Sequence, residues 1–467
     1  MDVGACWQTS KLANRFLLSL SSVPARSVLL TPQQRLREAV LLAFCDPMPS
    51  QSFTLLQLSP RQWQSLLRWL DISGLALYLY DRLAQFDLLE WLPPAVEARL
   101  RQNLADNTQR THRMLAECIE IQERFREEGF GYALLKGFSL VPCSLPRPEL
   151  RSQLDLDFLI AADAIGGARR ILEDRGYVLH AISGRSWEFK TTHPHAGSLR
   201  DLYKDHPARS IELHVEAGPG EAGTRIANAE WRDVCGFRMS VLAPVPLFLG
   251  QAAHLYKHVS TGFFRCSHLL ELYRHIVTKS EDVAFWSEVR KTVTANEHLA
   301  LPLGVTTLLL TRTMGSFAPE ALMEYAGGLP APVRLWTETI GPRCVYSSWP
   351  GTKLHLLLQR ELSANNSAKQ TSLRRALVPR RLPPAIAHAP ADETLFARMR
   401  RSYRQVSYIF FRLRYHTVAG VHYAWELARW KRLKQRLVHQ QNVTASTLSG
   451  NIAATDISET NKRMTIL

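Results

Sequence analysis

The feature that most constrains this chain is a short apolar segment, residues 154–160, that carries carboxylates at two alternate positions. Asp155 and Asp157 flank Leu156, and three further apolar residues follow them. Residues i and i+2 of a β-strand project from the same face, so both carboxylates can point at one ion. Burying such a pair is costly unless a metal or hydrogen-bond partners compensate the charge. The segment therefore predicts either a cation-binding strand or a solvated strand at the edge of a sheet.

Two other segments also predict strands with polar residues at one edge. The first, residues 132–136, ends in Lys136-Gly137. Glycine permits a sharp turn whose exposed amides suit phosphate oxygens, and the Lys136 ammonium can neutralise phosphate charge. The second segment contains Glu212. Its carboxylate can supply a third metal ligand if its strand lies beside the strand of Asp155 and Asp157. His214 shares the strand face of Glu212, so it either touches substrate or bonds to a neighbour.

Oxygen ligands of this kind indicate chemistry at a phosphate. Hard divalent cations such as Mg²⁺, or Mn²⁺, favour carboxylates, water and substrate phosphates together. Two ions held about 4 Å apart can stabilise the attacking and leaving oxygens of an in-line displacement at phosphorus. Arg151 precedes Asp155 by four residues. Its guanidinium suits phosphate and carboxylate equally, so phosphate binding, pairing with the acids and a surface salt bridge are all open.

These segments together resemble a known family, the uncharacterised nucleotidyltransferases of the DNA polymerase β-like superfamily. The resemblance is carried by Leu134-Leu135-Lys136-Gly137, residues 151–160, Gly176-Tyr177 and Ile211-Glu212-Leu213-His214. It extends upstream through residues 71–83 and 102–131 and downstream through 254–275. In all it covers about residues 30 to 280.

The resemblance implies a nucleotide-binding transferase. Asp155 and Asp157 would hold the metal, Glu212 would be the third carboxylate, and Lys136-Gly137 would form the turn on the nucleotide side. The implied reaction is magnesium-assisted transfer of a nucleoside monophosphate from an NTP, such as ATP, to an acceptor hydroxyl or amine. The acceptor can be a small molecule, a protein or an RNA. The wider superfamily usually has Gly-Ser at the turn, so phosphate binding by a serine hydroxyl is not available here in its usual form.

The periodicity predicts an α+β fold, with a small mixed β-sheet nucleotidyltransferase core flanked by helical regions at both ends. Thr31-Pro32-Gln33-Gln34 and Ser59-Pro60-Arg61-Gln62 are capping boxes that predict helix starts. In the core, Asp163 is expected to cap a helix that ends at Gly176. The predicted regions are helical 1–129, core 130–246, basic helical 247–440 and a disordered tail 441–467, rich in Thr, Ser, Asn and Ala.

Positive charge is concentrated in the last third of the chain. The formal net charge is +15, and residues 353–436 contain 18 Lys or Arg and four acids. This excess can attract an anionic partner or be an ordinary solvated surface. An alternative function is therefore a non-catalytic protein with the same fold, which contacts nucleic acid or a membrane through this region. Aromatic residues interleave with arginines over residues 403–430. We expect Tyr408, Phe411 and Tyr415 to form a buried stripe.

A pair of histidines has the spacing of a zinc site. His254 and His258 stand at i and i+4 of a predicted helix. No third ligand is evident in the sequence, so ordinary helix histidines are the favoured interpretation.

Cysteine usage and hydropathy bear on the cellular setting. The seven cysteines form no Cys-x-x-Cys pair, which favours a reducing compartment. No apolar run approaches the roughly 20 residues that cross a bilayer. The apolar stretch at residues 16–20 is short and interrupted by serine. We predict a cytoplasmic protein without a transmembrane segment.

Overall fold

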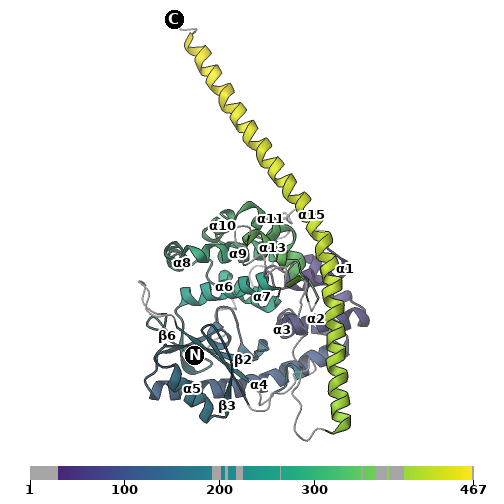
Figure 1. Cartoon of the computed structure of the whole chain (residues 1–467), viewed down its shortest axis with the longest axis vertical. Coiled ribbons are helices and arrows are strands. Elements are labelled where there is room, and N and C mark those ends of the chain that lie inside the picture. Colours follow the sequence, from purple (N-terminus) through teal and green to yellow (C-terminus); the bar gives the residue numbers. More distant parts are fainter. Residues whose placement is uncertain are drawn as a thin grey trace.

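The computed structural model describes residues 30–191, 201–205, 209–216, 225–262, 264–348, 351–363, 376–377 and 394–464, with side chains up to residue 439. A seven-stranded mixed sheet is surrounded by helices, and one long helix runs along an edge of the molecule (Figure 1). The predicted α+β class is confirmed.

The N-terminal part is helical, as its sequence predicts. Its helices are α1 (Pro32–Leu42), α2 (Pro60–Ser73), α3 (Ala76–Gln85) and α4 (Pro94–Glu127), with 3₁₀ turns at Ser50–Gln57 and Leu89–Trp91. Both predicted capping boxes form, because the Thr31 and Ser59 hydroxyls accept bonds from the backbone three residues on and the N3 glutamines bond back.

The sheet lies between residues 132 and 241. Its strands are β1 (Tyr132–Leu135), β2 (Asp155–Ile160), β3 (Tyr177–Ser183), β4 (Ser186–Thr191), β5 (Ser210–Val215), β6 (Glu230–Val234) and β7 (Phe237–Val241). They are ordered β3-β4-β5-β2-β1-β7-β6. The central strand β2 pairs in parallel with β5 and antiparallel with β1. Acids on β2 and β5 therefore meet in the middle of the sheet and not at its edge.

The hairpin β6–β7 was not predicted from the sequence. β6 is largely exposed and charged, which obscures its strand pattern. β7 does alternate apolar and polar residues and buries Met239, Ser240 and Val241, so its pattern was present in the sequence. Cys235 (φ 55°) and Gly236 (φ 82°) form its turn. Two consecutive positive φ angles are what a tight two-residue hairpin turn requires.

Each face of the sheet packs against a different group of helices. Leu156, Phe158 and Ile160 of β2 lie in a core with α4 and α5 (Ile165–Asp174). Leu159 and Ala133 point the other way, into a larger core built mainly by the remaining helices. Because Asp155 and Asp157 share a face with Leu159, the carboxylates lie on the side of that larger helical layer. The predicted cap of α5 is wrong: its N-cap is Ala164, and no side chain bonds there.

The C-terminal part forms the larger helical layer. It contains α6 (Pro244–Thr261), α7 (Cys266–Thr278), α8 (Val283–Ala295), α9 (Ala300–Met314), α10 (Glu320–Gly327), α11 (Ala331–Thr339), α12 (Gly341–Val345), α13 (His355–Leu362) and α15 (Leu395–Met464), with a 3₁₀ turn at Glu297–Leu299. No helix among the described residues is long and apolar enough to cross a membrane.

The long helix α15 is attached to the rest of the molecule near its middle. Glu426 pairs with both terminal nitrogens of Arg343, at 2.9 and 2.6 Å. Trp430 is buried and donates to Glu361, which also accepts from Lys434 at 2.6 Å. The helix then continues to Met464. The composition, in contrast, predicts disorder from residue 441 onward. Residues 442–464 contain one glycine and no proline, so no strong helix breaker lies in that stretch.

Candidate active site

The strand register places the predicted carboxylates together. Asp157 of β2 lies directly opposite Glu212 of β5, and Asp155 lies opposite Ser210. Partners in a parallel pair project to the same side, so Asp155, Asp157 and Glu212 share one face of the sheet. His214, two residues after Glu212, is on this face too. The sequence pattern allowed this grouping if the strand of Glu212 lay beside that of Asp155 and Asp157, and the parallel pairing of β2 with β5 meets that condition.

Asp157 is the most deeply buried member, with 3% of its side chain exposed. Its Oδ1 atom accepts hydrogen bonds from Lys136 Nζ at 3.0 Å and from His214 Nε2 at 2.9 Å. Burial alone would raise the pKa of Asp157. The bond from His214 and the charge of Lys136 outweigh that effect and lower the pKa to about 2. Asp157 is therefore held as a carboxylate.

Asp155 has the opposite environment. Burial, together with the negative charge of Asp157, raises the pKa of Asp155 to about 6, and Lys136 and Arg151 oppose this only in part. Two like charges in a desolvated site repel each other, and a bound cation relieves that repulsion. A cation bound on the face that Asp155 and Asp157 share would therefore reduce the repulsion between their charges.

Glu212 and His214 complete the cluster. His214 Nε2 lies 3.3 Å from Glu212 Oε2, and the Ser186 hydroxyl of β4 donates to the same oxygen at 3.4 Å. Hydrogen bonding to His214 lowers the pKa of Glu212. Burial opposes protonation of His214, yet its bonds to Asp157 and Glu212 raise its pKa above the usual value. His214 therefore bridges the two carboxylates through Nε2.

The Lys136-Gly137 turn has a backbone that few residues adopt. Lys136 has φ 54° and Gly137 has φ 52°. A Cβ atom at position 137 would lie 2.4 Å from Gln153 Nε2, which itself donates to the Asp155 carbonyl at 2.7 Å. The turn is closed by Ser139, whose backbone NH and hydroxyl both donate to the Lys136 carbonyl. A positive φ at a non-glycine residue is strained, and such strain concentrates at functional sites.

Arg151 lies beside the cluster but bonds elsewhere. Its Nε donates to Glu271 Oε1 of α7 at 2.9 Å, and both side chains are largely buried. Tyr78 of α3 donates to the same carboxylate oxygen at 3.1 Å. Arg151 therefore ties the segment before β2 to α7 and α3, while its charge still acts on Asp155. Sequence reasoning did not identify Glu271 as its partner, because the two residues are 120 positions apart.

The donor set fits a hard divalent cation. One ligand atom each from Asp157, Glu212 and His214 lie within 4.8 Å of one another. Asp155 is not in that group, although its carboxylate is on the same face and is coupled electrostatically to Asp157. Carboxylate oxygens are the ligands that Mg²⁺ and Mn²⁺ prefer. Lys136 and His214 both bond to Asp157, so a cation bound there would take over part of their role in compensating the charge of Asp157.

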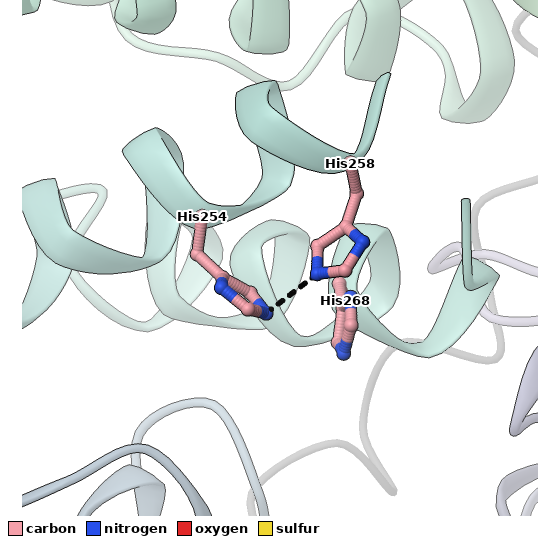
Figure 2. Close-up of side chains that lie close together, drawn as sticks. All are labelled: His254, His258 and His268. Atoms are coloured by element: carbon pink, nitrogen blue, oxygen red, sulfur yellow. Dashed lines mark hydrogen bonds between the residues drawn. The ribbon is translucent and has the colours of Figure 1, made fainter. Parts of the chain in front are cut away.

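The histidine pair on α6 does have a third member, contrary to the sequence interpretation. His268 of α7 joins His254 and His258, and one ring nitrogen from each lies within 4.8 Å of the others. Figure 2 shows the three rings gathered between the two helices. His268 could not be identified from the sequence, because its contact with the pair depends on how α7 folds back onto α6.

The aromatic residues expected to be buried along α15 are not. Phe411 is 39% exposed, and Tyr408 and Tyr415 are only partly covered. The apolar residues most exposed on the first half of this helix are Leu395, Phe396, Met399 and Tyr403, each more than 70% exposed. Arginines lie between them along the same helix.

Comparison with known families decides the assignment. The sequence model of a family described as uncharacterised nucleotidyltransferases matches residues 59–315, which is more than half of the chain. The chain belongs to this family. The matched range contains Lys136, Asp155, Asp157 and Glu212, and also α6 and α7. No curated protein matches the chain.

Two solved structures are similar to this nucleotidyltransferase family member. One is the antibiotic-resistance factor ANT(2'')-Ia, at 11% identity and a TM-score of 0.29, covering 40% of this chain and 97% of that one. The other is an antigenic nucleotidyltransferase-like protein from Paracoccidioides brasiliensis, at 11% identity and a TM-score of 0.24, covering 39% of this chain and 87% of that one. These scores are low, and the family assignment rests on the sequence match.

Proposed function

We propose that this protein transfers a nucleoside monophosphate from an NTP to an acceptor hydroxyl or amine. The observation that carries the proposal is the juxtaposition, on one sheet face, of Asp155, Asp157 and Glu212 beside the ammonium of Lys136. The family assignment supports the same class of reaction.

The proposed metal ligands are Asp155, Asp157 and Glu212. A divalent ion such as Mg²⁺ or Mn²⁺, when bound, supplies charge neutralisation for the phosphates. Asp157 is suited to this role because its lowered pKa keeps it ionised. His214, which bonds to two of these carboxylates, positions them and can contact the substrate.

The phosphate-binding residues in this proposal are Lys136, Gly137 and Arg151. Lys136 is 30% exposed at its side chain, so its ammonium can reach a ligand while remaining near Asp157. Gly137 contributes one backbone amide to the turn, and Gln153 packs where a side chain at this position would stand. Arg151 acts through its charge, because its Nε is already bonded to Glu271.

The chemistry is a substitution at the α-phosphorus. The acceptor oxygen or nitrogen forms a bond to that phosphorus, the bond to the bridging oxygen breaks, and pyrophosphate leaves. The acceptor proton passes to Glu212, which its bond to His214 keeps ionised by lowering its pKa. Lys136 stabilises the negative charge that develops on the phosphates.

Labelled nucleotides test the proposal. Wild-type protein, a cell extract and each of four NTPs are combined, with the label on the α-phosphate or on the γ-phosphate. We expect α-label to enter an acceptor and γ-label to leave as pyrophosphate. Asp157→Asn should abolish the product, while Asp163→Asn, an exposed acid on the loop after β2, should leave it unchanged. Transfer of γ-label, or α-label transfer that survives in Asp157→Asn, would contradict the proposal.

The exposed half of α15 favours a second candidate function, contact with an anionic membrane surface. Phe396, Met399 and Tyr403 recur at spacings of three and four residues and are 71–77% exposed. An apolar stripe with arginines beside it suits a lipid interface better than a nucleic acid. Co-sedimentation with anionic and neutral vesicles tests this function. Binding that is equal for both vesicle types, or binding to RNA alone, would contradict it.

A further inference from the structure

Three histidines from two adjacent helices meet beside the carboxylate site. His254 and His258 stand one helical turn apart on α6, so they share one face of that helix. α6 ends at Gly262 (φ 79°), and α7 begins at Cys266 and packs back against α6. This return brings His268, in the first turn of α7, against the pair (Figure 2). The three rings thus have their positions fixed by secondary structure and not by a loop.

The ring distances are those of a ligand set. His254 Nε2 and His258 Nε2 are 3.0 Å apart. The His268 ring centroid lies 4.8 Å from that of His254 and 4.9 Å from that of His258. Nitrogens bound tetrahedrally to one zinc ion at 2.0–2.1 Å would be roughly 3.3 Å apart. Small side-chain rotations would therefore bring all three nitrogens to one ion.

Two of the three histidines have lowered pKa values, because burial disfavours their charged forms. Burial, with the nearby positive charge of Lys136, lowers the pKa of His254 to about 2. Burial also lowers the pKa of His268 well below its usual value. Neutral imidazoles have a free lone pair for a metal. The Nδ1 atom of His268 is buried and has no hydrogen-bond partner within the described part of the chain.

The charges around the cluster are largely compensated. Lys136 is paired with Asp157 at 3.0 Å, and Arg151 is paired with Glu271 at 2.9 Å. Arg265 donates to the Ser152 hydroxyl at 3.2 Å. Two of the three nearest cations thus have a carboxylate partner, which reduces their repulsion of a divalent ion.

We propose that His254, His258 and His268 bind a zinc-class divalent transition-metal ion between α6 and α7, at a site distinct from the carboxylate cluster. Imidazole nitrogens suit zinc, cobalt, nickel and copper, whereas Mg²⁺ requires oxygen ligands. Three protein ligands leave a fourth position for water or another ligand. The bound ion ties α6 to α7 beside Asp157, whose charge is close enough to affect the pKa of His254.

Metal titration of the full-length protein tests the site. The protein is dialysed against a chelator and titrated with Co²⁺, whose visible absorption reports tetrahedral nitrogen coordination, and then with Zn²⁺ in competition. We expect one tightly bound equivalent in wild type. His268→Gln should weaken binding at least about 100-fold, since one of three ligands is lost. The matched control is His275→Gln, a buried histidine on the same helix outside the cluster.

Two further measurements keep the two metal sites apart. Asp157→Asn should weaken cobalt binding far less than His268→Gln, because Asp157 contributes charge near this site but is not a ligand of it. X-ray absorption of the wild-type cobalt complex should show three imidazole nitrogens, and this measurement does not depend on any variant folding. Absence of cobalt binding, an oxygen-only first shell, or loss of binding in Asp157→Asn but not in His268→Gln would overturn the proposal.

Discussion

The sheet and the helical layer each present a cluster of potential metal ligands, and the two clusters differ in every chemical respect. On the sheet, Asp155, Asp157 and Glu212 offer oxygens, and Lys136 and His214 balance their charge. Between α6 and α7, His254, His258 and His268 offer imidazole nitrogens. Hard and borderline cations are sorted by ligand type, so neighbouring sites of these two kinds can hold different ions.

The difference also separates roles. Both clusters are partly open: Glu212 is 29% and His214 27% exposed, and all three histidines are half-buried. The histidines are held on two packed helices, which suits an ion that stays bound. A comparison of variants from the two clusters therefore tests whether the clusters act independently.

The largest expected effect is that of Asp157→Asn on transfer. Loss of a central metal-binding carboxylate should lower the rate about 10³-fold or more, corresponding to about 4 kcal/mol. The measurement is the initial rate of product formation at saturating NTP. A rate within tenfold of wild type would remove Asp157 from the site, and Asp163→Asn, which changes an exposed acid on the loop after β2, provides the baseline.

Gly137→Ala should destabilise the turn of the carboxylate site. A positive φ costs an alanine about 1–2 kcal/mol, and displacement of Gln153 from the Asp155 carbonyl adds about 1 kcal/mol. Urea unfolding provides the measurement. Gly184→Ala is the matched control, because Gly184 has φ 59° and open space around its Cβ position. An equal loss of unfolding free energy in the two variants would show that the Gln153 contact contributes no stability.

Histidines of the helical layer should make stability depend on pH. Burial lowers the pKa of His275 to about 3, so between about pH 6.5 and 3 the unfolded chain binds a proton that the native chain does not. Stability from this group is complete above pH 6.5 and falls by about 1.4 kcal/mol per unit as the pH drops, or about 2 kcal/mol at pH 5. Denaturant unfolding at pH 7 and pH 5 measures the slope. His275→Gln should be less steep than wild type, and an unchanged slope would contradict the assignment of a neutral buried His275.

The smallest expected effect is that of Lys136→Met on nucleotide affinity. Loss of one charge-assisted phosphate contact should raise the NTP dissociation constant about tenfold, or about 1.4 kcal/mol. Isothermal titration measures it. Lys291→Met removes an ammonium that is 80% exposed on α8 and should leave the affinity unchanged. Equal affinities in the two variants would place Lys136 outside the nucleotide site.

The same comparison shows what sequence reasoning can reach. Alternation of polar and apolar residues identified the strands that carry Asp155, Asp157 and Glu212. This alternation reflects which strand face is buried and does not depend on the neighbouring strand. Capping boxes fixed two helix starts for the same local reason. The histidine cluster was not predicted as a set of three. His254 and His258 are neighbours on one helix, but the position of His268 beside them depends on tertiary packing. The Arg151–Glu271 pair escaped prediction because its members are 120 positions apart. The β6–β7 hairpin was not predicted because β6 is exposed and charged, although β7 alternates apolar and polar residues.

The exposure of aromatic side chains along α15 is another feature that the sequence did not predict. Aromatic residues at helical spacing predicted a buried stripe, but spacing indicates only that they share a face. Whether that face is covered depends on what packs against it, and in the structure Glu426 and Trp430 make the contacts instead. The proposed division into regions 1–129, 130–246 and 247–440 stays a prediction.

The most direct test of the carboxylate site is the melting temperature with Mg²⁺ and each of the four NTPs. A ligand at 100 times its dissociation constant stabilises the native state by about 2.7 kcal/mol, which is a readily measured shift. We predict that at least one NTP raises the melting temperature of wild type only when Mg²⁺ is present, and that Asp157→Asn shows no such shift. No shift with any NTP in wild type, or an equal shift in Asp157→Asn, would contradict the account.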